Sequence, residues 1–174
     1  KVNLDDLYPG DKNAILIAAR VLGYGKDYDF TINGKKHTVD LSTLDNKPFN
    51  ESLFENGVGN IEFTCPSTSN KITFKLLNGH DDKKVENTIK GLKKVHKDST
   101  PELTTRLKYM ITSVNGDEEQ KSINDFVDNH FLARDARAFR EYIKEIQPDI
   151  DLTIEVEGEE VNIPIGLSFF WPDL

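Results

Sequence analysis

The sequence predicts an α+β fold, in which small antiparallel β-hairpins combine with a helical bundle of about four to five helices, a C-terminal hairpin and an aromatic tail. Apolar and polar residues alternate on both sides of Asn33-Gly34, a dipeptide typical of tight hairpin turns. From about Asp81 onward the apolar residues recur every three or four positions, which is the period of helices. Alternation returns after Asp149, and three consecutive aromatic residues follow at 169–171.

The N-terminal part is expected to contain one helix and two hairpins. Asp11 can cap the helix, and Gly23 stands where the helix would stop. The alanine-rich face of this helix implies that another element packs closely against it. The hairpins cover residues 27–41 and 61–76, and they could pair into one antiparallel sheet of about four strands. The polar loop between them, residues 42–57, is long enough to suggest a contact surface.

The central part is expected to be helical. One helix begins at about Asp81, and a second begins at Thr100-Pro101-Glu102, where Thr can cap the helix and Pro suits its first position. The second helix is expected to end at Asn115-Gly116. Its apolar stripe consists of Leu103, Leu107, Met110, Ile111 and Val114. A third apolar stripe, at residues 123–131, leads into the next helix.

A strongly amphipathic helix is expected at residues 132–146. Its apolar stripe consists of Ala136, Phe139, Ile143 and Ile146. The other sides of this helix carry three arginines, Arg134, Arg137 and Arg140. Arg137 is one turn away from Glu141, so these two side chains can form an ion pair. The arginines could form a basic ridge for an acidic partner, since arginine is enriched in protein interfaces. They could equally form a solvated face that is salt-bridged to its neighbours.

The C-terminal residues provide a second candidate contact. Two strands are expected at 152–156 and 161–165, followed by Phe169, Phe170 and Trp171. In an extended chain Phe169 and Trp171 would face one surface and Phe170 the opposite one. The tail is therefore expected either to clamp a partner subunit onto the core or to seal the core alone. The candidate partner-binding residues are Arg134, Arg137, Arg140, Phe169, Phe170 and Trp171.

Length and composition limit the domain organisation and the classes of function that the chain can have. The 174 residues suit one α+β domain, 1–174, made of a helix with two hairpins (1–80), a helical part (81–148) and a hairpin with the aromatic tail (149–174). The net charge of −8 argues against a general nucleic-acid-binding surface. No apolar run approaches the ~20 residues of a membrane span, and a single cysteine excludes an internal disulfide. The chain begins with Lys1 rather than Met, which leaves open a further segment upstream.

No motif in the sequence indicates catalysis, a cofactor or a metal, and we expect none of these. Cys65-Pro66-Ser67-Thr68 lies in a turn where a zinc knuckle would carry Cys-x-x-Cys, but Thr68 stands in place of the second thiol. Cys65 is therefore expected to be buried, structural and metal-free. His80-Asp81-Asp82 is interpreted as a helix cap rather than an acid–base cluster, because acidic residues favour helix N-termini.

Seven stretches, taken together and in order, are similar to one family of tailed-phage proteins. They are residues 10–20 (GDKNAILIAAR), 23–25 (GYG), 63–66 (FTCP), 105–111 (TRLKYMI), 133–137 (ARDAR), 148–151 (PDID) and 169–172 (FFWP). The chain resembles, over nearly its whole length, the baseplate hub subunits and hub assembly proteins of T-even-type contractile-tail phages. Relatives with Cys-x-x-Cys in the knuckle differ from this chain at Thr68, and such relatives usually begin with a further upstream segment.

The resemblance implies a structural or assembly protein of the phage tail baseplate hub that acts by protein–protein contacts. It implies other baseplate or hub proteins as partners in a hetero-oligomeric assembly, without nucleic acid or membrane. The implied location is the host cytoplasm during assembly and, for a component that stays, the baseplate of the virion.

Two other functions remain as alternatives to a hub protein. A tail-associated cell-wall-degrading enzyme would need a cleft holding a carboxylic acid of raised pKa. An acidic adaptor would bind its partner through the arginine helix alone, and retention on heparin at moderate salt would support a nucleic-acid partner.

Overall fold

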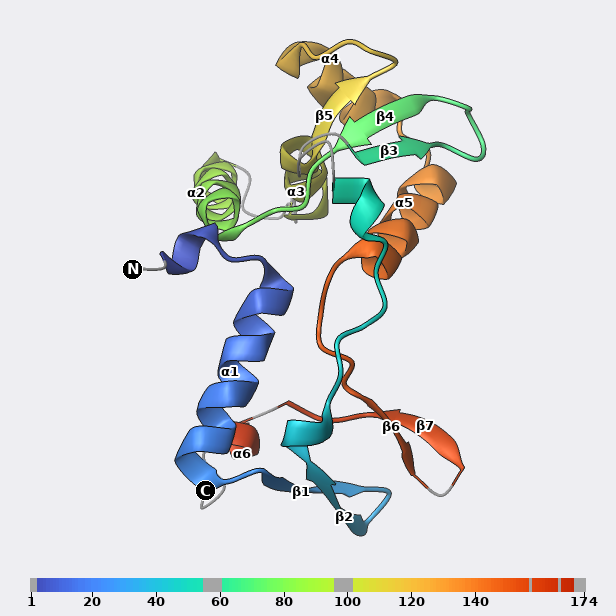
Figure 1. Ribbon diagram of the computed structural model, residues 1–174. Coiled ribbons are helices and arrows are strands. Elements are labelled where there is room, and N and C mark those ends of the chain that lie inside the picture. The colour runs from blue at the N-terminus through green and yellow to red at the C-terminus, as the bar shows by residue number, and fades with distance from the viewer. Residues whose placement is uncertain (1–2, 55–60, 96–101, 157, 166, 171–174) are drawn as a thin grey trace. The chain divides into compact units, whose positions relative to one another are not determined.

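Helices and short antiparallel strands are interspersed along the chain, which confirms the predicted α+β class (Figure 1). The computed structural model describes residues 3–54, 61–95, 102–156, 158–165 and 167–170. Within these ranges the strands form one three-stranded and two two-stranded sheets. No helix in the described part of the chain combines the length and the apolar character that crossing a bilayer requires.

The chain divides into two compact units. Unit 1 comprises residues 1–8 and 49–147, and unit 2 comprises residues 9–48 and 148–174. Unit 2 therefore combines residues from near both ends of the chain. The three consecutive parts expected from the sequence do not coincide with these units, because the C-terminal hairpin and tail belong with the first helix and the first hairpin.

The three-stranded sheet lies in unit 1, in the order β3-β4-β5. β3 (Ile61–Thr64) and β4 (Lys71–Phe74) form the hairpin predicted from the sequence. β5 (Ile111–Val114) is the second neighbour of β4 and pairs Ile111 with Phe74. The expected four-stranded sheet is therefore wrong, because β4 pairs with β5 and the hairpin at residues 27–41 forms a sheet of its own.

α3 (Glu102–Met110) ends earlier than predicted, and the residues after it form β5 instead of a final helical turn. Two of the four residues of β5 are apolar and β-branched, Ile111 and Val114, and a third, Thr112, is also β-branched, which favours a strand. Ile111 and Ser113 are buried and alternate with partly exposed neighbours. The helical spacing of the apolar residues continued by coincidence into a stretch whose side chains prefer a sheet.

The other helices of unit 1 agree with the sequence within a few residues. They are α2 (Gly79–Val95), α4 (Gln120–Asp125), which continues as a π-helical turn at Phe126–His130, and α5 (Ala133–Ile146). Short 3-10 turns lie at Leu4–Asp6 and Glu51–Phe54. In the core, Phe139 of α5 is 0% exposed, and its ring centroid lies 4.8 Å from that of Phe74 of β4 in an edge-to-face arrangement. This contact fixes α5 against the sheet.

The described part of unit 2 contains two hairpins and two α-helices. Its elements are α1 (Pro9–Tyr24), β1 (Asp27–Ile32), β2 (Lys35–Asp40), a 3-10 turn (Leu41–Thr43), β6 (Thr153–Val156), β7 (Glu159–Asn162) and α6 (Leu167–Phe170). Asn33 and Gly34 have φ angles of 50° and 79°, as the predicted tight turn requires. Its buried core residues are Ile17, Tyr28, Phe30, Leu41, Ile163 and Phe169.

α1 is longer than predicted at both ends. It begins at Pro9, because proline suits the first helical position, where no N–H partner is needed. Its last residue is Tyr24, and the glycine that terminates it is Gly25 rather than Gly23. Gly25 has a φ of 88°, and its N–H donates to the backbone oxygen of Val21 at 2.9 Å, which closes the last turn.

The chain passes between the two units at three places, each of which contains a proline. These prolines are Pro9, Pro48 and Pro148. Within unit 2, Asp149 follows Pro148 and bonds to residues that lie near Pro9 and Pro48 in the sequence. Its carboxylate accepts a hydrogen bond from Asn13 Nδ2 at 2.9 Å, and its backbone oxygen accepts one from Lys47 N at 2.8 Å. Asp149 thereby links the N-terminal part of α1 to Lys47.

Gly10 lies where a side chain has no room. A Cβ at Gly10 would lie 2.0 Å from the backbone oxygen of Pro148, whereas a Cβ at Gly23 of the same helix would meet no atom within 4 Å. We expect Gly10→Ala to lower the free energy of unfolding by about 2 kcal/mol or more through overpacking. Gly23→Ala should raise it by about 0.5–1 kcal/mol, because alanine is the better helix former. Urea unfolding of the two variants measures both changes, and equal changes would contradict the close approach at Gly10.

Candidate partner-binding surfaces

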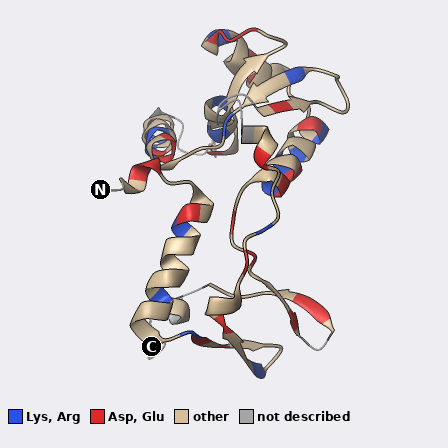
Figure 2. Ribbon diagram, in the orientation of Figure 1, with Lys and Arg blue, Asp and Glu red and all other residues tan. Residues whose placement is uncertain are grey.

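The three arginines predicted as a ridge lie on the exposed side of α5, where basic and acidic positions alternate (Figure 2). Arg137 donates from Nε to Glu141 Oε1 at 2.9 Å, which confirms the predicted pair. Arg140 donates from Nε to the backbone oxygen of Ala136 at 3.3 Å. Among the described residues, no ion pair joins Arg134, Arg137 or Arg140 to another element of the fold. The ridge is therefore accessible to a partner.

The opposite side of α5 is anchored in the core of unit 1. Phe139 and Asp135 are fully buried, and Ile146 is 6% exposed. Phe139 is also close to Phe63, with ring centroids 5.3 Å apart. Because the helix is fixed along its length, the arginines project from a rigid support rather than from a mobile loop.

Asp135 is the functional side chain that sequence reasoning missed. Its Oδ1 accepts a hydrogen bond from Ser67 N at 2.7 Å, and its Oδ2 accepts one from Thr68 Oγ1 at 2.9 Å. The turn that follows Cys65 is therefore held by a carboxylate from α5. Thr68, which stands in place of a second thiol, is one of the two donors. The available signal was the position of Asp135, four residues before Phe139 and thus on the buried side of the helix.

Burial and hydrogen bonding act in opposite directions on this carboxyl. Burial raises the pKa of Asp135, but the hydrogen bonds from Ser67 and Thr68 outweigh burial and hold the pKa below its usual value. Cys65 is 1% exposed, and burial together with the nearby Asp135 charge raises the pKa of its thiol. Cys65 is therefore a protonated core residue, as the prediction of a buried structural cysteine requires.

α1 has apolar residues on two opposite sides. Ile17 and Val21 face the core of unit 2, whereas Ile15, Ala18, Ala19 and Leu22 form a second stripe that is exposed. Leu22 is 88% exposed and Ile15 is 46% exposed. Figure 2 shows that most of α1 carries no charge. A helix that is apolar on two sides is normally covered on both, so this second stripe, the apolar stripe of α1, is a candidate contact surface.

The described part of the aromatic tail, Phe169 and Phe170, belongs to the core of unit 2. Phe169 is 0% exposed, and its ring centroid lies 4.9 Å from that of Tyr28 in an edge-to-face arrangement. Phe170 is partly buried against the same core, with its ring centroid 5.0 Å from that of Phe169. The expectation that Phe169 and Phe170 face opposite surfaces is wrong, because Leu167–Phe170 is a helical turn rather than an extended chain. Trp171 lies outside the described residues.

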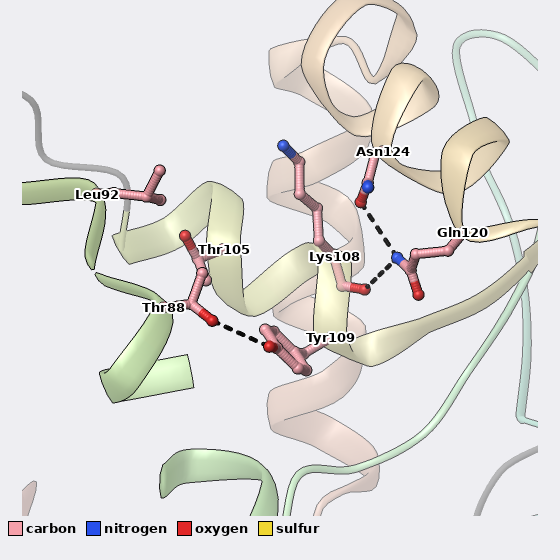
Figure 3. A pocket seen from close by; sticks show the side chains of 7 residues that line it. All are labelled: Thr88, Leu92, Thr105, Lys108, Tyr109, Gln120 and Asn124. Atoms are coloured by element: carbon pink, nitrogen blue, oxygen red, sulfur yellow. Dashed lines mark hydrogen bonds between the residues drawn. The ribbon is translucent and has the colours of Figure 1, made fainter. Parts of the chain in front are cut away.

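A pocket of about 400 Å³ lies between α2, α3 and α4 in unit 1 (Figure 3). Its lining residues are Thr88, Leu92, Thr105, Lys108, Tyr109, Gln120 and Asn124. Thr88 and Tyr109 share a hydrogen bond between their hydroxyls at 3.0 Å, and Gln120 Nε2 donates to Asn124 Oδ1 at 3.1 Å. Four of the polar side chains of the pocket thus bond to one another in two pairs, and Lys108 Nζ donates to Asp128 at 2.7 Å. No His, Cys, Asp or Glu is among the described residues that line the pocket.

The acidic cluster at the start of α2 is engaged in structural contacts. Asp81 pairs with Lys75 at 2.7 Å, and its backbone N–H donates to Asn78 Oδ1 at 3.1 Å. The predicted cap is therefore wrong, because Asn78 caps α2, and Asp81 and Asp82 lie in the first turn of the helix, where its dipole favours acids. His80 Nε2 lies 2.9 Å from Asp6 Oδ1. In the described ranges no group of three or more His, Cys, Asp or Glu residues is placed to hold a metal ion.

Comparison of the chain with known protein families, curated proteins and solved structures finds no match.

Proposed function

We propose that this chain is a structural or assembly protein of a phage tail baseplate hub, and that it acts by protein–protein contacts without catalysis. The similarity of its sequence stretches to baseplate hub proteins motivates the proposal. The observation that carries it is the exposed apolar stripe of α1. The protein would act in the host cytoplasm during assembly and, if it stays in the tail, in the baseplate of the virion.

Burial of the apolar stripe of α1 in an interface would contribute favourably to the free energy of association. Leu22 is almost fully exposed and Ile15 about half exposed. Burying both side chains in an interface would contribute roughly 3 kcal/mol before the entropic cost of association is subtracted. Ala18 and Ala19, which are small, lie between them along the stripe and would allow the backbone of a partner to approach closely.

The arginine ridge of α5 would add specificity to such contacts. Arg137 is 76% exposed, and its pairing with Glu141 within a single helix is worth only a few tenths of a kcal/mol. Exchanging that pair for an acidic group on a partner therefore costs little. Arginines at the rim of an interface mainly steer association and select the partner by charge.

Mass spectrometry of purified tails, and of baseplate assembly intermediates, tests the proposed function. A hub component should occur in both in a fixed ratio to other hub proteins, and an assembly factor should occur only in the intermediates. Absence from both would overturn the proposal. Cleavage of purified peptidoglycan by the isolated protein would instead favour the cell-wall-degrading enzyme.

Reversing the charge of the ridge should separate assembly from folding. We expect Arg137→Glu with Arg140→Glu to change the free energy of unfolding by no more than about 0.5 kcal/mol, because both side chains are exposed. The same variant should lose most of its incorporation into assembly intermediates. The matched control is Lys90→Glu with Lys94→Glu on α2, an exposed pair with the same charge change, which should incorporate normally. If both variants assemble like the wild type, the ridge is only a solvated face.

A further inference from the structure

Arg20 of α1 is a buried arginine with too few partners. Its side chain lies in unit 2 and is 5% exposed. Nη1 donates to the backbone oxygen of Gly25 at 3.1 Å, whereas Nε is buried and has no acceptor among the described residues. A guanidinium has five N–H donors, and the buried Nε–H is one that the Gly25 carbonyl does not satisfy.

Two tyrosines surround the guanidinium. Its Cζ lies 5.0 Å from the ring centroid of Tyr24 and 6.0 Å from that of Tyr28. The rings favour the positive charge and remove water from it, but they accept no strong hydrogen bond in the plane of the guanidinium. A desolvated arginine in this setting gains most from a carboxylate, which can accept two parallel N–H bonds.

The described acids of unit 2 form no ion pair with Arg20, and three of them are occupied by other donors. Hydrogen bonds from Lys26 and Ser42 lower the pKa of Asp40 to about 2. Asp149 accepts from Asn13, and Asp151 accepts from Thr153 N at 2.9 Å. A buried charge without a counter-charge raises the free energy of the folded state. A carboxylate from outside this set of acids would therefore stabilise Arg20.

We propose that Arg20 is a carboxylate-binding site, in which Gly25 and the two tyrosines orient the guanidinium and a carboxylate binds its Nε edge. Tyr24 is 52% exposed and is the side chain that would move to admit an external ligand. This assignment does not depend on the proposed role in a baseplate hub. It would make the C-terminal end of α1 a point of recognition for an acidic residue.

The carboxylate has two possible protein sources. One is Asp173, which lies outside the described residues, three positions after Phe170, the last residue of α6; three extended residues span at most roughly 11 Å. Phe169 contacts Tyr28, which in turn lies beside Arg20, so the last described helix of the chain packs against a side chain of the proposed site. The other source is an acidic side chain of a partner protein. The chemistry at Arg20 is the same in both cases.

Nuclear magnetic resonance of the arginine Nε–Hε groups in the full chain tests the proposal. The chain has five arginines, so the spectrum is sparse, and Arg20→Lys assigns the signal of Arg20. A carboxylate bound at Nε should shift this signal and slow its exchange with water. Two perturbations are applied: the variant Asp173→Asn, and titration with sodium acetate against sodium chloride at equal ionic strength.

Three outcomes are distinguished. If Asp173→Asn shifts the Arg20 signal and speeds its exchange several-fold, and acetate reverses the change, the site is occupied by this chain's own acid. If Asp173→Asn has no effect but acetate shifts the signal saturably in the wild type, the site is open to a partner's acid. If the signal responds to neither perturbation, the proposal is overturned. Arg106, which pairs with Asp82 at 3.0 Å, is the internal control and should not respond.

Discussion

Phe169→Ala is expected to unfold unit 2 selectively, lowering its free energy of unfolding by about 3–5 kcal/mol. The ring is fully buried and contacts both Tyr28 and Phe170, so truncation removes apolar burial and leaves a cavity. Phe170→Ala should cost less, because Phe170 is only partly buried. Truncation of the chain after residue 166 removes both rings and should destabilise unit 2 at least as much as Phe169→Ala.

Hydrogen exchange of backbone amides measures this effect in each unit separately. Phe169→Ala should reduce protection in β1 and β2, while β3, β4 and β5 stay protected. Phe139→Ala is the matched variant in the core of unit 1: it removes an equally buried ring and should show the reverse pattern. Equal loss of protection in both units after either change would contradict selective unfolding. It would establish instead the single cooperative domain that the sequence analysis expected.

Features that depend on neighbouring residues were predictable from the sequence. The turn at Asn33-Gly34 fixes its hairpin, because both residues adopt positive φ angles that few other dipeptides tolerate. α5 was predictable because its apolar stripe is regular and Pro148 limits its extension. The pairing of Arg137 with Glu141 follows from their spacing within one helix.

Features that depend on distant residues were not predictable. β5 forms because β4, far earlier in the chain, has a free edge that can pair with it. The residues around Ile111 do not indicate that this edge exists. Phe169 and Phe170 join the core of unit 2 because α6 is helical and the Phe169 ring reaches Tyr28, whereas an extended chain was expected for the aromatic tail. The buried state of Arg20 was equally hidden, because an arginine in a helix is ordinarily exposed.

Asp135→Ala is expected to lower the melting temperature of unit 1 by about 5–10 °C. The change leaves Ser67 N–H and the Thr68 hydroxyl without their acceptors, and it removes an acid from the first turn of α5, where the helix dipole favours it. Asp135→Asn should have a smaller effect. Its amide oxygen can still accept from Ser67, and its amide NH₂ can donate to the Thr68 hydroxyl. Arg134→Ala, at the exposed neighbouring position, is the control and should leave the melting temperature nearly unchanged.

The pH dependence of these variants tests the same contact independently. The pKa of Asp135 is held below the usual value of 3.8, so its contribution to stability is fully present above that value. The contribution is lost as the pH falls through the lowered pKa, because protonation removes a charge that only the folded state stabilises. The difference in melting temperature between wild type and Asp135→Asn should therefore be constant from neutral pH down to about pH 5 and shrink in stronger acid. A difference that stays constant throughout the acid range would show that the carboxylate charge does not hold the turn after Cys65, and that Asp135 acts there only by its shape.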